Sequence, residues 1–292
     1  MLDYTHCTLC PRHCGVDRSR GQLGFCKMPG QLRVARAAAH YWEEPVISGS
    51  FGSGTVFFSG CTLGCVFCQN QQISHENFGK EITSAHLREI FEQLIDDGVQ
   101  NINLVTPTHF LPSILPALTP KLSVPVVYNC GGYESVETLK ELEGLVDIYL
   151  PDFKYSDNRL AAKLSKAPDY FETASAAILE MFRQTGPVVI QDDQMQKGVI
   201  LRHLILPGFV DNSLGVLDWV ADHFQKGDIL FSLMSQYVPM GPVQPPLDRR
   251  VTEEEYDAVL SYLWFLGLED GYTQDFQAAT EEFIPKWDLS GL

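Results

Sequence analysis

Three cysteines, Cys61, Cys65 and Cys68, lie on one short segment directly after the apolar run Thr55-Val56-Phe57-Phe58. This order predicts a strand followed by a ligand-bearing loop. Three thiolates leave a four-coordinate zinc ion one ligand short, so a zinc site would recruit a fourth side chain. The C-x3-C-x2-C spacing can instead hold three irons of a 4Fe-4S cluster and leave the fourth iron open. We therefore favour a cluster over a zinc site or ordinary buried thiols.

The composition is typical of a globular chain without membrane segments. Hydrophobic residues make up 45% and charged residues 20% of the 292 positions, and no run approaches the roughly 18 apolar residues of a membrane span. The length allows one or two domains, or a single α/β barrel. The first six residues lack the basic start and apolar core of a signal peptide. We expect a cytoplasmic protein with no membrane partner.

The placement of the cysteines and the distribution of charge narrow the possible classes of protein further. Seven of the eight cysteines fall within residues 7–68, and in a reducing compartment such clustering favours metal binding over disulfides. The formal net charge of −16 divides into +4 for residues 1–40 and −20 for the remainder. Residues 41–292 would repel the negatively charged phosphates of nucleic acid, so no nucleic-acid partner is expected.

After residue 54, short apolar runs rich in β-branched residues alternate with helical patterns. This alternation predicts repeated β-α units and a parallel sheet. The expected strands are 55–59, 101–105, 125–129, 146–150, either 188–191 or 199–206, and 229–233. The predicted fold class is therefore α/β, a partial (β/α)6 TIM-type barrel.

Helices are expected where apolar residues recur at helical spacing. One stripe runs from Leu87 to Ile95, and another lies between Ser135 and Gly144. Thr252 and Glu255 form a capping-box pattern ahead of a late helix. The expected units are a four-cysteine metal-binding segment (1–50), the partial barrel (51–240) and a helical extension packed on it (241–292).

Functional groups of parallel barrels gather after the carboxyl ends of the strands, which is where the cysteine loop falls. The other strand ends carry polar residues beside glycine or proline. They read Thr106-Pro107-Thr108-His109, Asn129-Cys130-Gly131-Gly132-Tyr133, Asp152-Phe153-Lys154, Arg202-His203-Leu204-Ile205-Leu206-Pro207-Gly208 and Met234-Ser235-Gln236-Tyr237-Val238-Pro239.

With Phe67 before the last cysteine, the loop resembles the C-x3-C-x-aromatic-C signature of radical S-adenosylmethionine (SAM) enzymes, whose open iron chelates SAM. Together with the strand ends, it resembles the pyruvate formate-lyase activating enzyme-related radical SAM proteins over nearly the whole chain, from Cys7 to about Pro239. The cysteine loop and the Asp-x-Lys after the fourth strand are the specific parts. The fold implied is the radical SAM core barrel.

The resemblance implies cofactor-binding roles for the strand ends. Asn129 would lie near the SAM ribose, Asp152 and Lys154 near its carboxylate and sulfonium, and His203 near the adenosine. Activating enzymes usually carry Gly-Gly-Glu after the second strand for the SAM amino group. Here Thr106-Pro107-Thr108 takes that place, so Thr106 and Thr108 are the substitute candidates. His109 is expected to be structural rather than a metal ligand or general base, and Cys130 a buried inert thiol.

A second cysteine set precedes the barrel. Cys7, Cys10, Cys14 and Cys26 form C-x2-C-P-x2-C-x11-C, a complete set of four soft ligands. A closed four-thiolate site fits structural zinc, and it fits a second 4Fe-4S cluster equally well.

The expected function is reductive cleavage of SAM to a 5′-deoxyadenosyl radical, catalysed at Cys61, Cys65 and Cys68. The radical would abstract hydrogen from a substrate; the resemblance implies a glycine of a partner protein, and a peptide or small molecule stays open. The electron would come from a donor such as flavodoxin or ferredoxin. One alternative is a non-catalytic electron-transfer or metal-sensing protein whose cluster is closed by a fourth ligand, with His75 the nearest candidate. Another is a zinc-binding interaction module.

Overall fold

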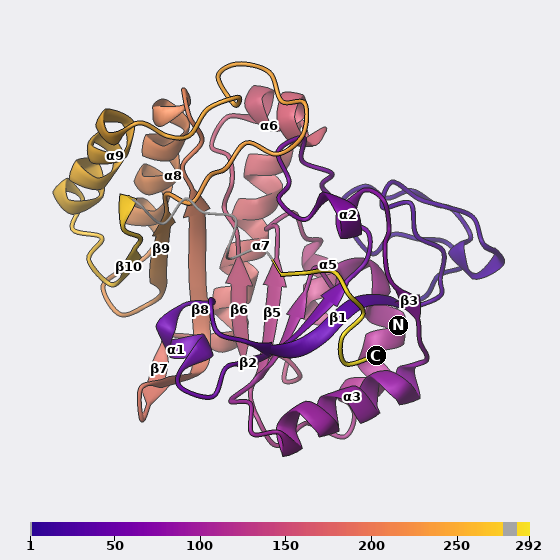
Figure 1. Cartoon of the computed structure of the whole chain (residues 1–292). Helices are drawn as coiled ribbons and strands as arrows, with labels where there is room; N and C mark the ends of the chain where they lie inside the picture. The colour runs from indigo at the N-terminus through magenta and orange to yellow at the C-terminus, as the bar shows by residue number, and fades with distance from the viewer. Residues whose placement is uncertain (1, 277–284) are drawn as a thin grey trace.

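The structure, a computed structural model, describes residues 2–276 and 285–292. In this part of the chain, seven parallel strands form the centre in the order β10-β9-β8-β6-β5-β4-β2 (Figure 1). They are β2 (Ser53–Phe58), β4 (Ile102–Val105), β5 (Val126–Cys130), β6 (Ile148–Pro151), β8 (Gln194–Leu204), β9 (Leu230–Met234) and β10 (Gly271–Thr273).

Three antiparallel strands border this sheet. Strand β1 (Arg33–His40) pairs with β2, and β3 (Lys80–Glu81) pairs with β1. Strand β7 (Val189–Gln191) forms a hairpin with β8. Strands β2 and β10 do not pair with each other in the described residues, so the barrel is partial, as predicted.

Helices connect the parallel strands and cover the convex face of the sheet (Figure 1). The longer ones are α3 (Ser84–Asp96), α5 (Val136–Lys140), α6 (Asn158–Ser165), α7 (Tyr170–Thr185), α8 (Val210–His223) and α9 (Glu253–Phe265). Short helices are α1 (Pro45–Ser48), α2 (Gln71–Ser74) and α4 (Leu111–Ile114). None of the described helices is long and apolar enough to cross a membrane.

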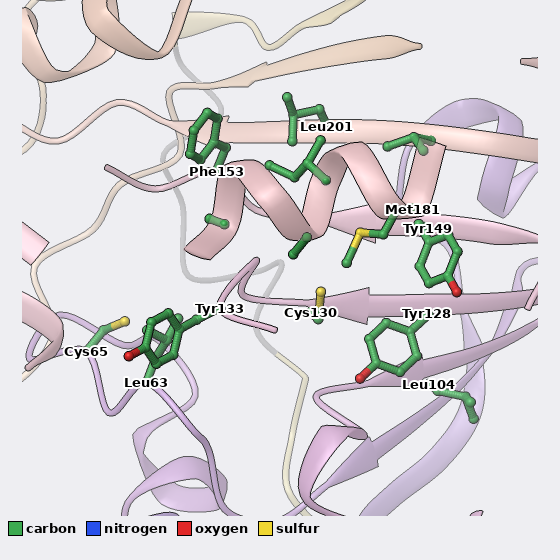
Figure 2. Packing of buried hydrophobic residues seen from close by; sticks show 14 of the residues in the cluster. Leu63, Cys65, Leu104, Tyr128, Cys130, Tyr133, Tyr149, Phe153, Met181 and Leu201 are labelled. Carbon is green, nitrogen blue, oxygen red and sulfur yellow. The ribbon is translucent and has the colours of Figure 1, made fainter. Parts of the chain in front are cut away.

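The two faces of the sheet bury different clusters. Tyr128 and Tyr149 belong to the large core under the helices, where their rings meet edge to face at 5.8 Å (Figure 2). The concave face holds a small cluster to which α1 contributes Ile47, and its other members are Val127, Ile148, Leu150, Met195 and Ile200. Because side chains alternate across a strand, the next inward positions toward the carboxyl ends are Asn129, Asp152 and Arg202.

The sequence predicted the α/β class and the partial barrel correctly. Both candidates for the fifth strand are strands, but only β8 belongs to the parallel set. The capping box at Thr252 is present and begins α9. The extension 241–292 is not entirely helical, because β10 pairs with β9. The three residues of β10 are too few to show an alternating pattern, so no strand could be predicted there.

Candidate active site at the carboxyl ends of the strands

The three cysteines of the loop after β2 line one cavity. It has a volume of about 260 Å³, and the carboxyl ends of β4, β5, β6 and β8 form other parts of its wall. The loop and the strand ends therefore face the same space, as a parallel barrel requires. A larger open depression of about 560 Å³ lies around Asn212 and Glu255, and no cysteine lines it.

Each of the three sulfurs accepts a hydrogen bond from a neighbouring group. The donors are Leu63 N–H to Cys61 Sγ at 3.4 Å, Ser165 Oγ–H to Cys65 Sγ at 3.0 Å and Ser74 Oγ–H to Cys68 Sγ at 3.3 Å. Burial raises the pKa of Cys65, and it raises that of Cys68 to about 12. Thiols this buried stay protonated unless a metal centre takes the place of the proton.

A network of ion pairs forms the polar wall of the cavity. Arg202 Nε lies 2.9 Å from Asp152 Oδ1, and Arg202 Nη2 donates to Asn129 Oδ1 at 2.7 Å. Arg202 Nη1 lies 3.1 Å from Glu43 Oε2, on the loop after β1. Lys154 Nζ lies 2.5 Å from Asp152 Oδ2. Two carboxylates thus face two cations, and the wall is balanced in charge when all four are ionised.

The environment keeps most of this network ionised. Burial opposes ionisation of Asp152, but Arg202 and Lys154 together hold the pKa of its carboxyl below the usual value. Burial likewise opposes the charge on Lys154, and Asp152 raises the pKa of its ammonium in spite of it. Glu43 differs, because burial raises its pKa although Arg202 is adjacent.

The donor set fits a 4Fe-4S cluster with one open iron. Three hydrogen-bonded thiols lie beside charged groups suited to the amino and carboxylate groups of SAM. Among residues 2–276 and 285–292, no three Cys, His, Asp or Glu side chains converge on a single metal ion. Each thiolate of a four-iron cluster binds a different iron, so a cluster does not need that convergence.

Comparisons with known proteins agree with this donor set. A family model described as a 4Fe-4S single cluster domain matches residues 48–110, which contain all three cysteines of the loop. The uncharacterized protein MJ0674 of Methanocaldococcus jannaschii is 31% identical over 270 residues, which are 88% of this chain and 74% of that protein. The chain belongs to the MJ0674 family.

Solved structures show the fold of this MJ0674 family member. HydG, a maturase of the [FeFe]-hydrogenase, superposes with a TM-score of 0.52 at 15% identity, covering 79% of this chain and 54% of HydG. Streptococcus suis SuiB bound to S-adenosylmethionine gives 0.50 at 14% identity over 76% of this chain and 50% of SuiB. SuiB bound to precursor peptide SuiA also gives 0.50, over 75% and 48%. The chain spans about half the length of these structures. Its mostly parallel α/β sheet resembles that of radical SAM TIM-type barrel enzymes.

Five of the seven predicted cofactor-binding residues line the cavity, namely Phe67, Thr106, Asn129, Asp152 and Lys154. Their roles toward SAM stay predictions. The other two, His203 and Thr108, do not line it. His203 is buried beneath α8, with Nδ1 bound to Phe153 O at 2.7 Å and Nε2 to Ser213 Oγ at 2.8 Å. Thr108 donates to the buried Glu134 at 2.9 Å. Both side chains already have internal partners, so the structure does not support contact with SAM.

The remaining histidine and cysteine candidates have structural partners. His109 is fully buried with Nε2 2.7 Å from Ser59 O, and burial lowers its pKa to about 3. His75 Nδ1 lies 3.0 Å from Ser74 Oγ, and His75 does not line the cavity. Cys130 lies at the end of β5 (Figure 2). It is among the residues that line the cavity, and burial raises the pKa of its thiol well above the usual value.

Sequence reasoning missed two members of the ion-pair network. Arg202 follows Ile200 by two positions on a strand, and this alternation could have identified it as inward-facing. Glu43 lies between β1 and α1 and reaches the cavity only through the fold. Nothing in the local sequence around Glu43 signals that role.

Proposed function

We propose that this chain is a radical SAM enzyme, with Cys61, Cys65 and Cys68 as the cluster ligands. The observation that carries the proposal is that these three thiols, which lie in the segment matched by the 4Fe-4S family model, line the same cavity as the ion-pair network of Arg202. A bound cluster with an open iron would supply the electron that cleaves SAM to methionine and a 5′-deoxyadenosyl radical.

The chain itself binds, orients and excludes water. Lys154 offers a cation to the SAM carboxylate, and Asp152 holds that ammonium in place from 2.5 Å. Arg202 donates to Asn129 Oδ1, and Asn129 Nδ2 donates to Glu43 Oε1 at 3.3 Å, so the amide is held in place and its second N–H is the group proposed to bind a ribose hydroxyl. Apolar residues such as Phe67, Leu63 and Leu204 line the same cavity and limit access of water to a reactive radical.

The proposed substrate is a glycine in a protein or peptide. The resemblance to activating enzymes supports this, as does the fold shared with SuiB, which has been solved with a precursor peptide. The cavity is also bordered by Trp42, whose side chain is 64% exposed and offers an aromatic surface for a peptide. A protein or peptide substrate is tested by labelling its glycines with deuterium and measuring the deuterium that appears in 5′-deoxyadenosine. Transfer of deuterium only from a labelled pool of small molecules would support the small-molecule alternative.

The decisive experiment is anaerobic reconstitution followed by electron paramagnetic resonance with and without SAM. We expect a reduced 4Fe-4S signal that changes on adding SAM, together with formation of 5′-deoxyadenosine. Cys65→Ser should lose both, whereas Cys130→Ser, a cavity cysteine outside the loop, should keep its iron. A wild-type spectrum indifferent to SAM, without 5′-deoxyadenosine, would instead support the closed-cluster electron-transfer alternative.

A further inference from the structure

The chain path gathers the N-terminal cysteine set, which comprises Cys7, Cys10, Cys14 and Cys26. Backbone bonds from Cys7 N to Val16 O and from Gly15 N to Cys7 O, each 3.0 Å, fold residues 14–16 back onto Cys7. A turn closed by His13 N and Cys10 O at 3.0 Å joins the second and third cysteines. Phe25 N donates to Cys14 Sγ at 3.3 Å, which brings the neighbouring Cys26 to the same place.

The set lies beside a buried cation that lacks a carboxylate partner. Arg18 is fully buried, and among the described residues no carboxylate lies within ion-pair distance of it. Its donors bind the carbonyls of Met28, Pro29 and His109, and Nη1 lies 3.7 Å from Cys7 Sγ. A buried charge without a counter-charge is costly. Four thiolates around a metal centre would carry the missing negative charge.

The number of ligands fits zinc and a cluster alike, but the position of the fourth cysteine favours a cluster. Structural zinc sites typically present two pairs of ligands, each pair closely spaced in the sequence. Here three cysteines fall within eight residues, and eleven residues separate the third from the fourth. Three close cysteines plus one remote cysteine is the arrangement of 4Fe-4S and 2Fe-2S ligand runs.

The segment that carries this set packs directly on the cysteine loop of the barrel. Arg12, between the second and third cysteines, donates to Thr62 O at 2.9 Å and Leu63 O at 3.3 Å. Gly60, directly before Cys61, has a φ of +84°, and a Cβ there would lie 3.0 Å from Cys26 O. The two cysteine sites are therefore separated by little more than backbone at this contact.

We infer that the N-terminal cysteine set binds a second 4Fe-4S cluster that passes electrons to the cluster at Cys61, Cys65 and Cys68. The relay role rests on the proposed function, whereas the cluster itself does not. Electrons pass from the donor to the two clusters one at a time. A reduced protein donor, of the flavodoxin or ferredoxin class, loses one electron to the N-terminal cluster. That cluster is reoxidised as the barrel cluster takes up the same electron, which is then consumed in cleaving one SAM.

The test of the metal uses the triple variant Cys61→Ala/Cys65→Ala/Cys68→Ala, reconstituted anaerobically. About four iron and four sulfide per chain should remain in the variant, against about eight of each in wild type, and its reduced spectrum should not respond to SAM. Retained zinc, or folded protein without iron, would overturn the inference. Cys130→Ala is the matched control and should keep the wild-type iron content.

The test of the relay compares two reductants in Cys10→Ala/Cys14→Ala. Dithionite is small and can reduce the barrel cluster directly, whereas a protein donor would enter through the N-terminal cluster. For each protein we take the rate of SAM cleavage driven by the protein donor divided by the rate driven by dithionite. We expect this ratio to be at least tenfold lower in the variant than in wild type. An unchanged ratio contradicts the relay, and if this variant does not fold, the triple variant still decides the metal. Four iron retained there, with no SAM cleavage by wild type, would refute the proposed function alone.

Discussion

Two arginines of low solvent exposure, Arg18 and Arg202, differ in how their charges are balanced. Arg202 has two carboxylates within 3.1 Å, Glu43 and Asp152, besides the amide of Asn129. Arg18 has backbone carbonyls and the sulfur of Cys7. The charge of Arg202 is therefore balanced by protein groups, whereas Arg18 has no anionic partner among the described residues unless the thiols beside it are ionised.

This difference shows what each region is built to receive. The balanced wall around Arg202 lines a cavity with only three thiols, so it can admit a ligand from outside. The N-terminal cysteine set has four thiols, enough to close a metal site and leave no position for SAM. The number of ligands is thus consistent with the two proposed roles, chemistry at the three-cysteine site and electron transfer at the four-cysteine site.

The largest expected effect is a loss of free energy of unfolding when either arginine is replaced. Arg202→Met leaves Glu43 without its ion pair, and breaking a buried pair costs about 3–5 kcal/mol, which should lower Tm by roughly 10 °C. Because its partners are carboxylates, the loss should be the same in metal-loaded and chelator-treated protein. Arg18→Met should cost about 2 kcal/mol more in loaded protein, where a charged thiolate accepts its hydrogen bond.

Thermal unfolding of both variants, with and without metal, measures this contrast. Arg159→Met is a suitable control, since its side chain is 94% exposed and its ion pair within the described residues is with the nearby Asp157. An Arg18 penalty that is independent of metal would remove the electrostatic difference between the two regions.

A smaller effect is expected at Lys154, and on ligand affinity rather than on folding. Lys154→Gln removes the charge-assisted hydrogen bond that we propose to the SAM carboxylate, worth about 1.5–3 kcal/mol, or about 10- to 100-fold in affinity. Iron content should not change, because Lys154 is not a cluster ligand. Equilibrium binding of SAM to the reconstituted protein measures this, with the exposed Lys163→Gln as control. An unchanged affinity would return Lys154 to a structural role as the partner of Asp152.

The sequence predicted the barrel and the cysteine loop because both depend on local pattern. Apolar runs mark the strands, and the ligand spacing marks the loop. The prediction failed where the choice between two neighbouring residues decides which face of a strand a side chain occupies. Arg202 and His203 are neighbours on β8, and successive side chains point to opposite faces, so selecting His203 placed the predicted contact beneath α8 instead of in the cavity. Glu43 could not be found at all, because its position depends on how β1 packs beside β2.

His203 should therefore affect folding and its pH dependence, with the smallest effect of the three. Burial lowers its pKa to about 4, below the value of about 6.5 in an unfolded chain. Its stabilising contribution is complete above about pH 6.5 and decreases as the pH falls toward 4, because the unfolded chain then binds the proton more readily.

Between about pH 7.5 and 5.5, wild type should lose about 1 kcal/mol more free energy of unfolding than His203→Gln. Urea unfolding at both pH values measures this, and other buried groups such as Glu134 cancel because both proteins carry them. His223→Gln, on the exposed end of α8, is the matched control for the change of a histidine to glutamine. Equal pH dependence in His203→Gln and wild type would mean that His203 is not held neutral, and the case for placing it outside the SAM cavity would weaken.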